Sequence, residues 1–64
     1  MKPRFFYSLN GRAFQPLFGP RSMKSAYALA RKAHPNAADI EVIPRIRFIV
    51  FSTYNPDHYS PEYL

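Results

Sequence analysis

The sequence has no cysteine, only two glycines and only four carboxylate side chains among its 64 residues. The lack of cysteine excludes a disulfide framework and any zinc site that uses thiolate ligands. Two histidines and scattered carboxylates predict neither a structural metal nor a cofactor. The most apolar run, residues 48–51, is far shorter than a membrane span or the apolar core of a secretory signal. We therefore expect a cytoplasmic protein that has no contact with a membrane.

Aromatic residues and basic charge are abundant in this short chain. Six Phe and five Tyr make up 17% of the residues, and nine Lys and Arg give a formal net charge of +5. All nine basic residues lie at or before Arg47, so residues 1–54 carry a net charge of +7 and residues 55–64 carry −2. Residues 54–63 also contain the pattern Tyr, polar residue, Pro, acid and aromatic ring twice, at a five-residue period. These features predict one domain over residues 1–54 and a C-terminal tail rich in Tyr and Pro over residues 55–64.

A β-hairpin is predicted near the N-terminus by the Asn10-Gly11 pair, which lies between two runs of strand-forming residues. Both central residues of a type I′ turn need positive φ, which Asn and Gly adopt most readily. A two-residue loop places Tyr7 opposite Phe14. We expect one face of this hairpin to enter the core, and its side chains are Phe5, Tyr7, Leu9 and Phe14.

An amphipathic helix is predicted from Met23 to His34. Ser22 is a favourable N-cap, and Pro35 disfavours the helical conformation of the residue before it. The apolar residues form one continuous arc of the helical wheel, which we expect to pack on the sheet. The residues of this arc are Met23, Ala26, Tyr27, Leu29, Ala30 and Ala33.

Residues 40–54 return to strand chemistry, with an interruption at Pro44. Pro44 predicts a bulge, a bend or an edge position, and it leaves open whether one strand bends or two are separated. One face of the predicted strand holds Ile40, Val42, Ile46, Phe48 and Val50. The order predicts an α+β fold of ββαβ type, a three-stranded and mainly antiparallel sheet with one helix packed on one face. We expect the first strand at the centre, and only the tail is left to cover the second face.

The opposite face of the 40–54 strand mixes arginines with apolar side chains, which is unusual for a surface in contact with water. Three interpretations stay open. The tail folds back over this face, a partner protein or a second copy covers it, or its rings stack on nucleic-acid bases while its arginines hold phosphates. Together with the basic residues of the hairpin and helix and the tyrosines of the tail, the candidate partner-binding residues are Phe6, Arg12, Lys24, Arg31, Lys32, Arg45, Arg47, Ile49, Phe51, Tyr54, Tyr59 and Tyr63.

Motifs for catalysis are missing from the sequence. Neither glycine belongs to a phosphate-binding loop, and no serine lies in a glycine-flanked elbow. His34 and His58 could act as an acid–base pair for RNA cleavage. However, His34 is better explained as a helix C-terminal residue that stabilises the last carbonyls, and His58 lies in the polar tail. We therefore expect a protein that is not an enzyme and carries no catalytic residues.

Residues from Pro16 to Ile49 resemble, in their layout, very small proteins encoded by bacteriophages. A short strand is followed by the helical stretch 22–35 and then by the strand-like stretch 40–46. This order is similar to that of small phage inhibitors of host RNA polymerase, in which one helix crosses a three-stranded sheet. The resemblance implies a protein that docks on a host enzyme without catalysis. The aromatic hairpin and the Tyr-Pro tail are not part of that pattern.

Three functional hypotheses follow. The first is a small inhibitor or modulator that docks on a larger host protein with an acidic surface, one involved in nucleic-acid processing or defence. The second is direct binding of DNA or RNA through the basic and aromatic sheet face. The third is a small nuclease-like enzyme. A homodimer is compatible with the apolar residues of the same face.

Overall fold

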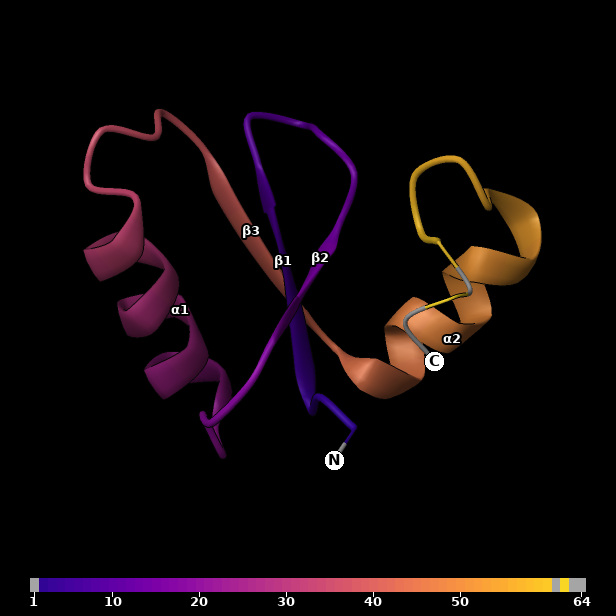
Figure 1. The fold of residues 1–64 in the computed structure, drawn as a ribbon, viewed down its shortest axis with the longest axis horizontal. Coiled ribbons are helices and arrows are strands. Elements are labelled where there is room, and N and C mark those ends of the chain that lie inside the picture. Colours follow the sequence, from indigo (N-terminus) through magenta and orange to yellow (C-terminus); the bar gives the residue numbers. More distant parts are fainter. Residues whose placement is uncertain (1, 61, 63–64) are drawn as a thin grey trace.

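The chain folds around a three-stranded antiparallel sheet with one helix on each face (Figure 1). The computed structural model describes residues 2–60 and residue 62. The elements are β1 (Phe5–Leu9), β2 (Gln15–Leu17), α1 (Met23–Ala33), β3 (Ile40–Pro44) and α2 (Arg45–Tyr54). The predicted α+β class and the ββαβ order are confirmed. The helix α2, which covers the second face of the sheet, was not predicted.

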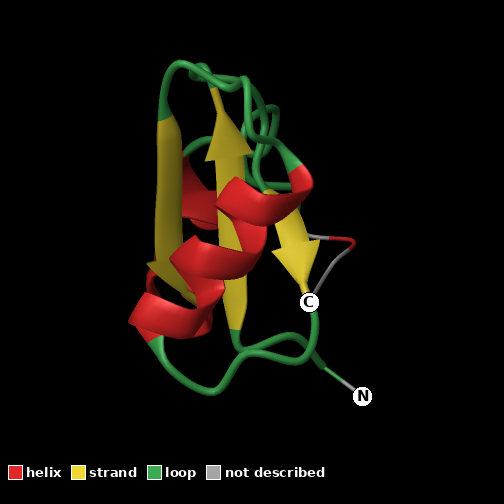
Figure 2. Cartoon of the chain, turned by 90° about the vertical axis from the view of Figure 1, so that its left-hand side faces the viewer, coloured by secondary structure: helices red, strands yellow, loops and turns green. Residues whose placement is uncertain are grey.

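The strand order is β2-β1-β3, so β1 is the central strand, as predicted (Figure 2). β3 runs antiparallel to β1, with Phe5 opposite Pro44 at one end and Leu9 opposite Ile40 at the other. β2 is the short edge strand and contains Pro16. An edge strand tolerates proline because one side of the strand needs no ladder hydrogen bonds.

The hairpin turn forms as predicted. Asn10 and Gly11 both have positive φ, 55° and 75°, and the Arg12 N–H donates a hydrogen bond to the Leu9 carbonyl at 3.1 Å. The turn also ties down the loop before β3. The Asn10 N–H donates to the Asp39 carbonyl at 2.8 Å, and the Asn10 side-chain oxygen accepts from the Asp39 N–H at 3.0 Å.

Beyond the turn, however, the two strands pair one residue out of the predicted register. Tyr7 lies opposite Gln15 and not opposite Phe14. The second strand therefore contains one extra residue between the turn and the ladder, as in a β-bulge. A shift of one residue exchanges the faces of a strand, which is why Phe14 joins the side chains on the α2 face of the sheet.

The main hydrophobic core lies between the sheet and α2. Its buried residues are Phe6, Phe14, Ile43 and Phe48. The rings of Phe6 and Phe48 stack with their centroids 3.7 Å apart. The predicted core face of the hairpin is therefore wrong for three of its four residues, because Phe5, Tyr7 and Leu9 are only half-buried on the α1 side.

α1 agrees closely with its predicted limits. The Ser22 side chain accepts a hydrogen bond from the Ser25 N–H at 3.1 Å, which caps the first turn. His34 is the C-cap residue, and its N–H donates to the Ala30 carbonyl at 2.9 Å. Pro35 follows directly and ends the helix.

The contact of α1 with the sheet uses smaller residues than predicted. Only Ala26 and Ala30 of α1 are buried. Met23, Tyr27 and Leu29 are each at least 40% exposed, so their predicted place in the core is wrong. Alanines bring the helix backbone close to the strands, and the larger side chains then lie at the margins of the contact.

The prediction of strand structure over residues 40–54 is wrong after Pro44, which ends β3 and serves as the N-cap of α2. Pro44 therefore neither bends one strand nor separates two. The β-branched and aromatic residues that follow favour a strand locally, but such propensities are weak. Helical structure brings Phe48 onto Phe6 and covers a sheet face that is otherwise open to water.

The tail segment 55–60 folds back along this core. The Phe14 N–H donates to the His58 carbonyl at 2.9 Å. The ring of Tyr59 stacks on Phe14 at 4.8 Å and meets Phe48 at 5.8 Å. The second sheet face is thus covered within the chain, by α2 together with the tail. The interpretation in which this sheet face stacks on nucleic-acid bases is therefore wrong.

Candidate protein-docking surface

α2 has two faces of different size. The inner face contributes only Phe48 and Ser52 to the buried part of the molecule. On the outer face, Ile46, Val50 and Tyr54 follow one another at four-residue spacing and are 73%, 50% and 83% exposed. Residues four apart lie side by side on a helix, so these three side chains form one apolar stripe.

An open groove runs beside this stripe. It has a volume of about 330 Å³ and is lined by Pro44, Ile46, Arg47, Val50 and Phe51. Four of these five side chains are apolar. The Arg47 guanidinium lies over the Phe51 ring, 5.9 Å from its centroid. The groove therefore offers apolar surface with one positive charge at its border.

The start of α2 is held by Arg45. Its backbone N–H donates to the Arg4 carbonyl at 2.8 Å, which joins α2 to the residue before β1. The Arg45 side chain is half-buried, and its Nε has no hydrogen-bond partner among the described residues. Two arginines in the first turn oppose the helix dipole, which favours negative charge at that end. Their placement therefore does not help the helix to form.

The structure brings five of the predicted partner-binding residues together on α2, namely Arg45, Arg47, Ile49, Phe51 and Tyr54. Ile49 is 39% exposed and Phe51 is 37% exposed, so both extend the apolar stripe sideways. These residues were predicted on a strand. The helix keeps them on one element, with Arg45 half-buried at its start and the other four exposed.

Two predicted residues belong to the core. Phe6 is completely buried, so the prediction that it contacts a partner is wrong. Tyr59 is half-buried among aromatic rings. Burial raises the pKa of Tyr59 above its ordinary value, and the negative charge of Glu41 raises it further. The predicted residue Tyr63 lies outside the described residues.

The remaining predicted residues lie away from α2. Lys24, Arg31 and Lys32 belong to α1, on the other side of the sheet (Figure 1). Arg31 has a structural role there, because its guanidinium donates to the Ala37 carbonyl at 2.7 Å and holds the loop after α1. Arg12 is exposed at the hairpin turn. The predicted residues therefore do not form a single surface.

The two histidines are not brought together. The His34 ring lies 5.6 Å from that of Tyr7, on the α1 side of the sheet. The His58 ring meets Phe14 at 5.5 Å, on the α2 side. The sheet separates the two imidazoles, so they do not form the acid–base pair that the nuclease hypothesis requires.

Ile46 and Val50 are the site residues that the sequence interpretation missed, because it placed them on the buried face of a strand. Two signals pointed to a helix. Pro44 immediately precedes the segment, and proline is common at the start of helices. Asn55 is the C-cap residue, a position that suits asparagine.

No known protein family, curated protein or solved structure matches this chain. Across residues 2–60, no helix has the length and hydrophobicity needed to span a membrane. Within the described part of the chain, no three His, Asp or Glu side chains are grouped so that they could hold a metal ion.

Proposed function

We propose that this protein is a small, non-enzymatic binding protein that docks the outer face of α2 into an apolar groove of a larger partner protein. One observation carries the proposal. Five apolar side chains of a ten-residue helix are more than a third exposed. Helices that are apolar all round are normally buried, and nothing in the described chain covers this face.

The chemistry of the partner follows from the outer face of α2. Amphipathic helices bind grooves through anchors spaced by three or four residues, and Ile46, Val50 and Tyr54 have that spacing. Arg47 borders the same groove, and the whole chain carries a formal charge of +5. A partner with carboxylates around an apolar groove is attracted, whereas a second copy approaches against repulsion.

The biological setting is proposed from the resemblance in layout. Small phage inhibitors dock on host enzymes of nucleic-acid processing, and the order of strand, helix and strand between Pro16 and Ile49 is similar to theirs. We therefore propose that the partner is a host protein of nucleic-acid processing or defence in the bacterial cytoplasm, and that the chain inhibits or modulates it.

Site-specific crosslinking tests the surface. A photoreactive phenylalanine analogue replaces Val50 in one variant and Lys32, on the opposite side of the sheet, in the control. After irradiation in bacterial cells, we expect one dominant protein adduct from position 50, resistant to nuclease, and none from position 32. The partner identified by mass spectrometry is then purified and bound in vitro.

Binding measurements with the purified partner separate the role of the apolar anchors from that of the charge at the border of the groove. Ile46→Asp is expected to weaken binding by at least about tenfold, because apolar anchors at the centre of an interface dominate affinity. Arg47→Gln is expected to slow association and reduce its salt dependence. An adduct of twice the 7.5 kDa chain mass would show self-association instead. Equal adducts from both positions, or full binding by the Ile46→Asp variant, would contradict the proposed surface.

A further inference from the structure

The basic residues are concentrated at one end of the sheet. β1 begins at this end, and β2 and β3 finish there. Five of the nine Lys and Arg lie in the segments that meet at this end, and they are Lys2, Arg4, Arg21, Arg45 and Arg47. Asp39 and Glu41 lie at the opposite end, where β3 starts. The molecule therefore has one strongly positive end.

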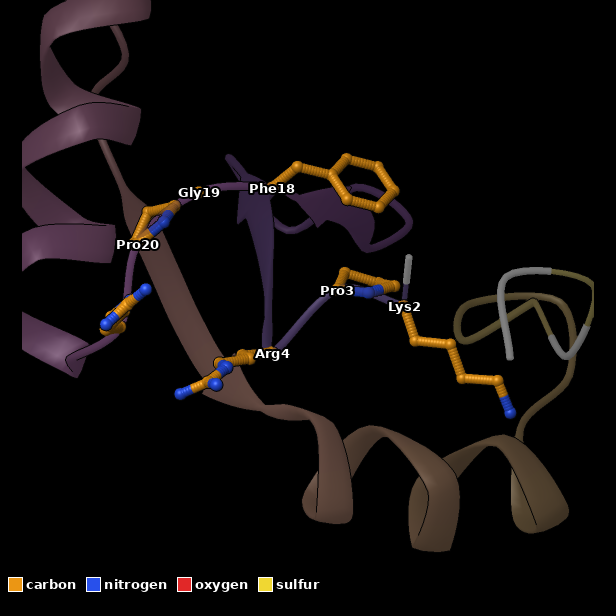
Figure 3. A pocket seen from close by; sticks show the side chains of 7 residues that line it. Lys2, Pro3, Arg4, Phe18, Gly19 and Pro20 are labelled. Atoms are coloured by element: carbon orange, nitrogen blue, oxygen red, sulfur yellow. The ribbon is translucent and has the colours of Figure 1, made fainter.

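A pocket opens at this positive end, between the residues that lead into β1 and the loop from β2 to α1 (Figure 3). Its volume is about 280 Å³, and its lining residues are Lys2, Pro3, Arg4, Phe18, Gly19, Pro20 and Arg21. Three of these seven residues are cations and none is an acid. None of the three cationic side chains forms an ion pair or a hydrogen bond with a described residue.

The pocket also has an aromatic wall. Phe18 is 52% exposed although it is a large apolar residue. Gly19, with φ at 108°, turns the chain directly after it in a conformation that other residues rarely adopt. Figure 3 shows the rings of Phe18 and Pro3 on one side of the pocket and the Arg4 guanidinium on the other. The Lys2 side chain extends away from Arg4, so cations lie on both sides of the rings.

We propose that this pocket binds single-stranded nucleic acid, with one base stacked against Phe18 and with the neighbouring phosphates held by Arg4, Arg21 and Lys2. Proteins that bind single strands combine exposed aromatic rings with cations that follow the phosphates. A duplex keeps its bases stacked inside and cannot offer one to Phe18. An acidic peptide could use the cations, but it leaves the exposed ring without a partner.

This site is independent of the proposed docking function. The pocket shares no lining residue with the groove beside α2. The nucleic-acid hypothesis is thereby moved from the predicted sheet face, which is buried, to a different surface made largely of residues that the sequence interpretation did not select. An experiment that disproves binding at one site would therefore leave the proposal for the other site unaffected.

Fluorescence anisotropy with a labelled thymidine oligonucleotide of about ten nucleotides tests the proposal, since single-strand sites span about 4–16 nucleotides. Arg4→Gln and Arg21→Gln are each expected to reduce the slope of log affinity against log salt by about 0.7, the value for one phosphate contact on a single strand. Phe18→Leu is expected to weaken binding about tenfold and to leave that slope unchanged. The charge-matched control is Arg12→Gln at the far end of the sheet. It should reduce the salt slope less than Arg4→Gln or Arg21→Gln does.

Four outcomes would overturn the proposal. They are a duplex of equal length that binds as tightly as the single strand, a Phe18→Leu variant with unchanged affinity, a glutamate peptide that competes as well as the oligonucleotide, and thymidine monophosphate that competes equally on a molar basis. Val50→Ser, which alters only the outer face of α2, is expected to leave oligonucleotide binding intact. Circular dichroism of each variant confirms that the exposed substitutions preserve the fold.

Discussion

The two helices lie on opposite faces of one sheet, yet their sequences divide inside from outside in very different ways. α1 places alanines against the sheet and most of its charged residues in water. α2 places Phe48 and Ser52 inside and leaves Ile46, Val50 and Tyr54 outside. Both helices leave large apolar side chains partly exposed, but those of α1 are 40–43% exposed, whereas Ile46 and Tyr54 of α2 are 73% and 83% exposed.

The ends of the two helices also differ, because only α1 has charged or capping side chains that stabilise its termini. α1 has a serine cap at its start and the basic residues Arg31 and Lys32 in its last turn, where they favour the helix dipole. α2 has no side-chain cap and begins with Arg45 and Arg47. α1 is thus stabilised by its own local sequence, whereas α2 depends on the aromatic core beneath it.

The largest expected effect is on the inner face of α2. Phe48→Ala removes a completely buried ring that stacks on Phe6. Such a change typically lowers the free energy of unfolding by roughly 3–5 kcal/mol, a loss comparable to the whole stability of a domain this small. Urea denaturation followed by circular dichroism measures the loss. Phe51→Ala, the same substitution at a partly exposed position of α2, should cost clearly less, and equal losses would refute the division of α2 into two faces.

A smaller effect is expected from overfilling the contact beneath α1. Ala30→Leu inserts a large side chain where an alanine is 1% exposed, and overpacking typically costs about 1–3 kcal/mol. Ala28→Leu on the exposed side of the same helix is the control and should change stability little, because leucine and alanine are both good helix formers. Urea denaturation of the two variants measures the contrast. If both variants are equally stable, the close approach of α1 to the sheet does not require an alanine at position 30.

The smallest effect concerns the tail and depends on pH. The pKa of Tyr59 is raised in the folded protein, first by burial and then by Glu41, so the folded state holds the phenolic proton more tightly than the unfolded state. Its contribution to stability is complete below the unfolded value of about 10 and is lost as pH rises through the folded value. Tyr59→Phe should therefore lose less stability than the wild type between about pH 9 and 11. Tyr54→Phe, at an 83% exposed position, should follow the wild type in urea denaturation at both pH values.

Local signals in the sequence were sufficient for the hairpin turn and for α1. Asn10 and Gly11 adopt positive φ because their side chains permit it, and Ser22 and Pro35 limit a helix whatever surrounds it. The central position of β1 also followed, from the order of the elements alone. Each of these predictions depends on residues close together in the chain or on simple rules of connection.

The candidate docking surface could be predicted only in part. Arg45, Arg47, Ile49 and Phe51 were selected because one face of the predicted strand mixed arginines with apolar side chains. Tyr54 was selected among the tyrosines near the tail, and α2 carries all five residues. The predicted strand placed Ile46 and Val50 on its other face, so neither residue was selected. In the helix these two residues lie on the outer face, where they are 73% and 50% exposed.

By itself, the sequence determined the turn, the first helix, the order of the strands and the division of charge between residues 1–54 and residues 55–64, because these depend on local conformation and on composition. Only the tertiary structure decided the one-residue shift of β2, the helical form of residues 45–54 and the joining of Phe6, Phe14, Phe48 and Tyr59 in one core. These features are settled by packing between distant residues, since burying three phenylalanine rings together, with Tyr59 packed against them, outweighs the weak local preference of α2 for a strand.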